Sequence, residues 1–224
     1  MDQVIAGLVL LALVPVVWLL MLRAWRRRSA QQAAGTGDQP ALPPPAPLPA
    51  GAGEEWVGAD GAATDPAAAA RAARTVTGTY VSTVLSGRPF ERVTAHGLGS
   101  RSLVELEAVP PGQPADPTAG PSSTRSGAPR PGALLLRRPG AASFSIPAAD
   151  LVRVSRARGQ AGKVMFGKED LVVVTWRLGG AGGAEVDSAV RTKPQQDADR
   201  LVTLVEGLVP VDGARASDAG EDAA

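Results

Sequence analysis

The chain holds few residues that could perform chemistry. His96 is its only histidine, and cysteine is absent. Zinc sites and nucleophilic triads need several such groups brought together. We therefore expect no catalytic residue, no metal and no cofactor, and we interpret His96 as a residue that caps a turn or packs at a strand end. The sequence predicts that the protein is not an enzyme.

Two further patterns have a structural interpretation that we favour. The run Gly159-Gln160-Ala161-Gly162-Lys163 ends in Gly-Lys, as phosphate-binding loops do. Such loops need four residues between the glycines and a Ser or Thr after the lysine, whereas two residues and Val164 stand there. We expect a hairpin loop instead. Glu105 and Glu107 share one face of a predicted strand, because side chains alternate along a strand, and we expect that face to be solvated.

One cluster of basic residues could contact anionic lipid. Five cations fall within sixteen positions of a chain whose formal net charge is only +1. They are Arg153, Arg156, Arg158, Lys163 and Lys168. Such residues can hold phosphate groups through charge-assisted hydrogen bonds. The alternative, which we favour, is a strand edge protected by charge. The low net charge also argues against a partner nucleic acid, which needs a broad basic face.

The elements that would position these residues begin with a membrane helix. Residues 4–22 carry no charged or strongly polar side chain. As a helix this run would be about 28 Å long, close to the roughly 30 Å hydrocarbon core of a bilayer. A cleaved secretory signal would carry positive charge before the apolar run, but Asp2 is the only charge there. The sequence predicts a single-pass transmembrane helix over 4–22.

Basic residues directly after this run predict its orientation. The juxtamembrane segment 23–28 reads Arg-Ala-Trp-Arg-Arg-Arg. Arginines accumulate on the cytoplasmic side of a membrane helix, and tryptophan suits the headgroup region. The predicted topology determinants are Arg23, Trp25, Arg26, Arg27 and Arg28. We expect a protein of the inner (plasma) membrane with its N-terminus outside and its C-terminal domain in the cytoplasm.

Three segments are predicted to be disordered. Residues 29–72 are rich in Pro, Ala and Gly and form a linker, in which residues 43–49 should adopt polyproline II as a spacer rather than as a ligand. Such a tether would let the domain visit the membrane surface without being fixed to it. A short helix over 67–74 could precede the domain. The insertion 110–131 and the acidic tail 211–224 complete the disordered set.

Strand patterns followed by one helix fill residues 75–209. Runs of β-branched residues, or alternation of apolar and polar ones, indicate strands. These runs cover residues 75–84, 92–95, 102–109, 132–137, 142–146, 151–156, 170–178 and 184–190, with 170–178 the most buried. The apolar stripe of the helix consists of Leu201, Leu204, Val205 and Leu208. These residues have helical spacing. The predicted helix begins with a capping box from Thr192 to Gln195 and ends at Gly207 or Pro210.

This order of elements resembles a pleckstrin-homology-like (PH-like) barrel, in which about seven antiparallel strands are capped by one C-terminal amphipathic helix. Four runs carry a closer resemblance: Tyr80-Val81-Ser82-Thr83, Arg92-Val93-Thr94-Ala95-His96-Gly97-Leu98-Gly99, Ile146-Pro147 and Leu171-Val172-Val173-Val174-Thr175-Trp176. They resemble actinobacterial single-pass membrane proteins with a cytoplasmic bacterial PH-like domain, often labelled as export or transporter proteins. The resemblance covers residues 75–209 and the anchor. It implies a mainly β fold and no known substrate.

These observations together favour a membrane-anchored cytoplasmic interaction module. Such a protein would recruit or scaffold a partner protein at the inner membrane, for example by presenting a strand edge to a peptide. One alternative is an accessory subunit of a membrane transport or export complex, with its span packed against other helices. A second alternative is a domain that binds anionic lipid. The expected partners are the lipid bilayer and a protein, and neither nucleic acid nor a small-molecule ligand is expected.

Overall fold

The computed structural model describes the chain in several ranges. They are residues 2–35, 41–49, 52, 66–112, 131–157, 159–160, 163–164, 171–192 and 195–210, with the side chains of the first helix described from Leu13 onward. The predicted disordered tail 211–224 and most of the insertion 110–131 lie outside the described residues. Arg158 and Lys168 lie outside them too.

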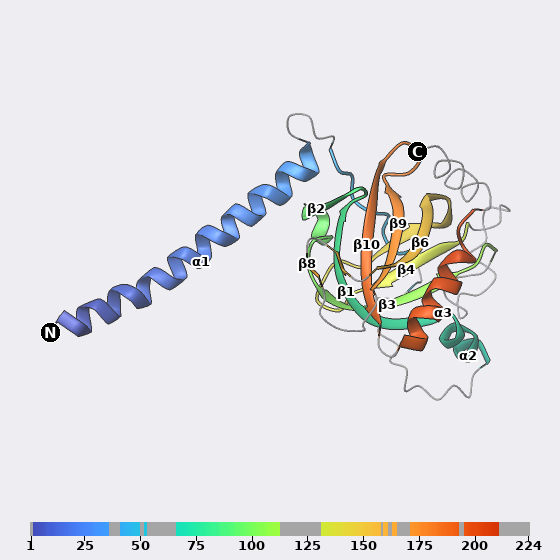
Figure 1. Ribbon diagram of the computed structural model, residues 1–224, viewed down its shortest axis with the longest axis horizontal. Helices are drawn as coiled ribbons and strands as arrows, with labels where there is room; N and C mark the ends of the chain where they lie inside the picture. The colour runs from blue at the N-terminus through green and yellow to red at the C-terminus, as the bar shows by residue number, and fades with distance from the viewer. Residues whose placement is uncertain are drawn as a thin grey trace.

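One antiparallel sheet forms the body of the domain and curves around the core (Figure 1). The strands are β1 (Thr75–Leu85), β2 (Arg88–Arg92), β3 (Ser102–Val109), β4 (Ala133–Arg137), β5 (Phe144–Pro147), β6 (Leu151–Ala157), β9 (Leu171–Leu178) and β10 (Ala184–Thr192). Seven of them follow the order β5-β4-β3-β1-β10-β9-β6, and β2 pairs with β1 beside this path. A separate hairpin of β7 (Gly159–Gln160) and β8 (Lys163–Val164) replaces the phosphate-loop alternative, as expected.

Apolar residues of β1, β5 and β9 enclose the core. β9, predicted to be the most buried strand, is buried along nearly its whole length. Three aromatic rings cross the interior: Tyr80 meets Phe144 edge-on at 6.3 Å between ring centroids, and Phe144 stacks on Trp176 at 5.9 Å. Aromatic pairs in these geometries stabilise a core beyond their buried area. The rings therefore join β1, β5 and β9 from inside.

A C-terminal helix covers the core, as the sequence predicts. α3 (Gln195–Glu206) packs against β1, β6, β9 and β10. Of its predicted apolar stripe, Leu201, Val205 and Leu208 are buried and Leu204 is partly buried. The predicted capping box is wrong, because Thr192 is the last residue of β10 and its buried hydroxyl makes no hydrogen bond within the described residues.

The N-terminal region differs most from expectation. α1 (Asp2–Ala34) runs unbroken through the basic segment 23–28 into the predicted linker. It ends at Ala34, and the φ of 72° at Gly35 suits a glycine just beyond a helix end. Figure 1 shows it leaving the domain as a long rod. Within the described part of the chain, no helix is both long and apolar enough to cross a membrane.

Two shorter segments also distinguish structure from prediction. The expected short helix before the domain is present as α2 (Pro66–Ala73). The strand predicted over 92–95 is displaced, because β2 ends at Arg92 and the chain turns into the 3-10 helix η1 (Ala95–Gly97). At the centre of η1, His96 has a φ of 53°, a left-handed conformation that no continuing strand can contain. A second 3-10 helix, η3 (Ala148–Asp150), joins β5 to β6.

Candidate functional site

The end of α1 docks on the domain through two side chains, Gln32 and Ser29. Gln32 Oε1 accepts hydrogen bonds from the backbone N–H groups of Thr94 at 2.6 Å and Ala95 at 3.2 Å, and from the Thr94 hydroxyl at 2.8 Å. Gln32 Nε2 donates to the Arg92 carbonyl at 2.9 Å, and the Ser29 hydroxyl donates to the Thr94 carbonyl at 3.0 Å. These main-chain groups lie where β2 has ended and ladder partners are lost. The helix supplies the partners that the sheet does not.

The loop that receives α1 is itself held from the core. Tyr80 donates its hydroxyl to the Leu98 carbonyl at 3.1 Å, just beyond η1. The Arg138 guanidinium donates to the Gly97 carbonyl at 3.2 Å and to the Ser100 carbonyl at 2.7 Å. The same guanidinium lies 4.1 Å from the centre of the Tyr80 ring, in cation–π geometry. The docking loop is therefore fixed to Tyr80 of β1 and to Arg138, the residue that follows β4.

A chain of buried hydroxyls supports Tyr80. Trp176 Nε1 donates to Ser188 Oγ at 3.0 Å, Ser188 Oγ lies 2.7 Å from Thr83 Oγ1, and Thr83 Oγ1 contacts the Tyr80 hydroxyl. Burial raises the pKa of Tyr80 above its usual value, and burial lowers the pKa of the Arg138 guanidinium. The network needs a protonated phenol, because the phenol donates to a carbonyl.

A segment predicted to be a free spacer lies against the domain. We call residues 41–49 together with Ala52 the strap. Its Leu42 is buried in the main core cluster, and Leu48 and Ala52 pack against a second cluster with Val109 and Leu135 on the outer face of β3 and β4. For this part of residues 29–72 the expectation of a disordered linker is wrong. The proline-rich composition gave no sign that two leucines of this segment, Leu42 and Leu48, pack against apolar residues of the domain.

The strap follows the edge of β5. The Leu42 N–H donates to the Gln32 carbonyl at 3.0 Å, so the strap begins against the end of α1. Ala46 forms an isolated antiparallel bridge with Ser145 in β5. His96 Nε2 lies 2.8 Å from the Leu42 carbonyl, and because a carbonyl only accepts, this nitrogen is the donor. His96 thus stands in the turn η1, but its ring binds the strap and does not cap that turn.

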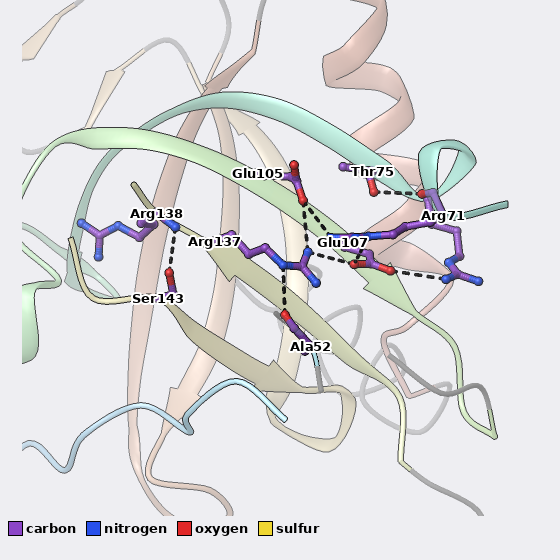
Figure 2. Close-up of polar contacts among 9 residues, drawn as sticks. Ala52, Arg71, Thr75, Glu105, Glu107, Arg137, Arg138 and Ser143 are labelled. Atoms are coloured by element: carbon purple, nitrogen blue, oxygen red, sulfur yellow. Dashed lines mark hydrogen bonds and ion pairs between the residues drawn. The ribbon is translucent and has the colours of Figure 1, made fainter. Parts of the chain in front are cut away.

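Five charged residues join the N-terminal segments to the sheet, and we call them the charged network. They are Arg71, Arg74, Glu105, Glu107 and Arg137. Arg137 Nη1 lies 2.8 Å from Glu107 and 3.1 Å from Glu105, while its Nε donates to the Ala52 carbonyl at 3.2 Å. Arg71 of α2 reaches both carboxylates, as Figure 2 shows. Arg138, the next residue after the end of β4, points away from this network in Figure 2.

The prediction that this face of β3 is solvated is therefore wrong. Glu105 and Glu107 do share one face, but their side chains have no exposed surface. Arginines from α2 and β4 approach from outside, and the strap covers the neighbouring part of the face. Sequence reasoning missed this because the partners Arg71 and Arg137 are 34 and 32 residues from Glu105. The available signal was weak: two carboxylates at strand spacing in a segment with otherwise apolar residues.

The five predicted lipid contacts are only partly placed. Arg153 and Arg156 are exposed on β6, and Arg156 forms an ion pair with Asp199 of α3. Only the main chain of Lys163 is described, and Arg158 and Lys168 lie outside the described residues. Within this part of the chain, the structure gives two basic side chains at one strand, one of them already paired. β6 itself pairs with β9 alone among the described strands.

The predicted topology determinants all lie on α1. Arg23, Trp25, Arg26, Arg27 and Arg28 are exposed there, one turn or more before Gln32. Among the described residues, no group of three or more His, Asp or Glu side chains could hold a metal ion. The contacts of Gln32, His96 and Ser145 form a surface that binds other segments of the chain. It holds a helix end and an extended strap, and its donors are oriented by the core.

Comparison with protein families gives one match. The chain matches the family described as bacterial PH domain-like over residues 59–115 and 118–206. This range begins shortly before α2 and ends at the last residue of α3. No curated protein matches the chain.

Proposed function

The chain belongs to the bacterial PH domain-like family, and on this premise we propose that it is a membrane-anchored module that recruits or scaffolds a partner protein at the inner membrane. PH-like domains are typically non-catalytic interaction modules. The N-terminal helix would hold this one at the bilayer, with the domain in the cytoplasm. The proposal joins the family's type of domain to the pattern of residues 4–28.

The docking of α1 carries this proposal. The helix continues from the apolar run to Gln32, which binds the domain. Gln32 lies four residues beyond Arg28, or about 6 Å along a helix. If residues 4–22 cross the bilayer and 23–28 lie among the headgroups, the domain is held against the membrane in one orientation. In this arrangement the docked helix α1 holds the domain, rather than the flexible tether that the composition of residues 29–72 predicts.

The arginines before the docking point support the same arrangement. Each cation close to an anionic leaflet contributes about 1 kcal/mol of attraction. Four arginines lie in residues 23–28, and none of them appears in the contacts that Ser29 and Gln32 make with the domain. They are exposed on the helix and available to headgroups. Membrane anchorage would thus use residues 23–28 of α1, and docking on the domain uses Ser29 and Gln32 of the same helix.

Single-cysteine labelling tests the proposal, because the natural chain has no cysteine to interfere. We would place one cysteine before the apolar run (Gln3→Cys) and one in the exposed turn after β9 (Ala181→Cys). In spheroplasts, a membrane-impermeant maleimide should label the first variant at once and the second only after permeabilisation. Labelling of Ala181→Cys in intact spheroplasts, or recovery of the chain in the soluble fraction, would overturn the proposal.

A further inference from the structure

We propose that the surface under the strap is a recognition groove for extended, proline-rich chain segments, and that the strap is its resident and exchangeable occupant. The partner of this module would then be a protein that carries such a segment and competes with the strap. This inference rests on the proposed function for its biological role. The binding itself is a separate claim, and it is tested separately.

Within the described residues, every side-chain hydrogen bond between the domain and the strap is donated by the domain, and the Ser145 N–H adds a main-chain bond in the same direction. The domain donates from His96 Nε2, from the Ser145 N–H at 2.8 Å and from Arg137 Nε. The Ser145 hydroxyl adds a fourth bond at 2.8 Å to the Pro47 carbonyl. The acceptors of these four bonds are main-chain carbonyls of the strap, at Leu42, Ala46, Pro47 and Ala52. Proline lacks the N–H but keeps its carbonyl, so a surface made of donors suits a proline-rich chain.

Side-chain contacts set the register along this groove. Leu42 enters the main core cluster and Leu48 packs on the outer cluster. Between them Pro43 lies against Gly179, where a Cβ atom would come within 2.5 Å of the proline Cγ. Six residues of polyproline II span about 19 Å. The groove therefore selects two leucines six positions apart, with prolines between them that keep the chain extended.

The connection of the strap to the domain permits exchange. Thirteen residues separate Ala52 from Pro66, the start of α2. Arg71 and Arg74 hold α2 on the sheet through their own ion pairs. Departure of the strap therefore removes the Ala52 contact from the charged network and leaves the bonds of α2 in place. A tethered segment competes at an effective concentration in the millimolar range, so a partner binds well only where it is locally abundant or the strap is displaced.

Hydrogen exchange on the full chain in detergent gives the first test. The Ser145 amide donates to the strap, at Ala46, so its exchange reports strap release without any substitution. We expect it to exchange at least tenfold faster than the amides of β9 at the centre of the sheet. Equal protection of Ser145 and β9 would mean that the strap leaves only when the domain unfolds, and would overturn the proposal.

Peptide binding gives the second test. The probe is a fluorescent peptide of residues 41–52, and the full-length variant Leu42→Asp ejects the strap by placing a charge in the core. We expect the peptide to bind this variant at least tenfold more tightly than the natural chain. The variant Ala41→Asp, changed at the neighbouring exposed residue, should behave as the natural chain does. A peptide with Asp in place of the first leucine should not bind.

Three outcomes of the peptide test would contradict the groove. One is no binding to a Leu42→Asp chain whose β9 amides remain protected. The others are equal binding to the natural chain and to the variant, which would show that the strap does not compete, and equal binding of the two peptides. If Leu42→Asp fails to fold, exchange at Ser145 still decides. None of these readouts depends on membrane topology, so their failure and a failed labelling experiment are distinguishable.

Discussion

Gln32 and Thr94 lie 62 residues apart, yet one amide oxygen of Gln32 accepts from both the main-chain N–H and the hydroxyl of Thr94. The same glutamine donates to the Arg92 carbonyl. A single side chain thus satisfies main-chain groups that β2 leaves behind when it ends. Because Tyr80 and Arg138 fix the following turn to the core, the direction of α1 is coupled to the interior of the domain.

Replacing Gln32 should release α1 from the domain. In Gln32→Ala, the amides of Thr94 and Ala95 lose their acceptor, at a cost of about 1–3 kcal/mol for a buried unsatisfied group. We expect hydrogen exchange of these two amides to accelerate about tenfold or more, while the amides of β9 are unchanged. Arg27→Ala, a truncation at an exposed position of the same helix, is the control. Unchanged protection of Thr94 would show that Gln32 does not hold the helix.

Glu107 should be far more important for stability than an exposed glutamate. It accepts from Arg71, Arg74 and Arg137 and is fully buried. Removing one partner from a buried ion pair strands the remaining charges, so Glu107→Ala should lower the free energy of unfolding by about 3–5 kcal/mol. Chemical denaturation of the full chain measures this loss. Its control is Glu91→Ala in the exposed pair with Arg88, where less than about 1 kcal/mol is expected.

A loss at Glu107 no larger than that at Glu91 would contradict the buried network. The salt dependence of stability should also distinguish the two variants, because dissolved ions screen exposed ion pairs much more than buried ones. Raising the salt concentration should therefore shrink the small effect of Glu91→Ala. It should leave most of the effect of Glu107→Ala.

Much of the domain could be predicted because its signals are local. The alternation along β3, the continuous apolar run of β9, the glycine-rich turn before β10 and the apolar stripe of α3 each depend on residues close in sequence. The prediction of a strand over 92–95 was wrong, and the reason is local too. His96 leaves the extended conformation, and β-branched neighbours gave no sign that a non-glycine residue would adopt a positive φ.

The candidate site could not be predicted because its contacts are distant. Gln32 stands in a segment whose composition indicates a linker, and its partners lie about sixty residues away. The strap has too few apolar residues to fold alone. It is ordered because the sheet already presents donors and two apolar sites. Glu105 and Glu107 were interpreted as solvated because their arginine partners come from α2 and β4.

Tyr80 should make stability fall at alkaline pH. Burial raises its pKa, so the folded protein keeps a proton that the unfolded chain releases near pH 10. The unfolded state then binds fewer protons, and the free energy of unfolding decreases as pH rises above about 10, by at most about 1.4 kcal/mol per pH unit. Tyr80 is the only tyrosine, so phenolate absorbance reports it directly.

The matched variant for this titration is Tyr80→Phe, which keeps the ring in the core. It should lose about 0.5–2 kcal/mol at neutral pH with the hydrogen bond to Leu98. It should also lack the additional decline above pH 10 that the natural chain shows. A native absorbance midpoint at or below that of the denatured chain would show that the phenol is not buried in the way described.

Alanine substitutions at two glycines of one turn distinguish the effect of the strap contact from the effect of backbone strain. Gly179 and Gly182 have φ values of 96° and 84°, so alanine at either position adopts a strained left-handed conformation that costs about 1–2 kcal/mol. Only at Gly179 would the new Cβ meet Pro43, whereas nothing lies within 4 Å at Gly182. Gly179→Ala should therefore cost about 1–3 kcal/mol more, as overpacking does, and should accelerate exchange of the Ser145 amide. Equal losses in chemical denaturation, with Ser145 protection unchanged in both variants, would mean that Pro43 does not rest on this turn.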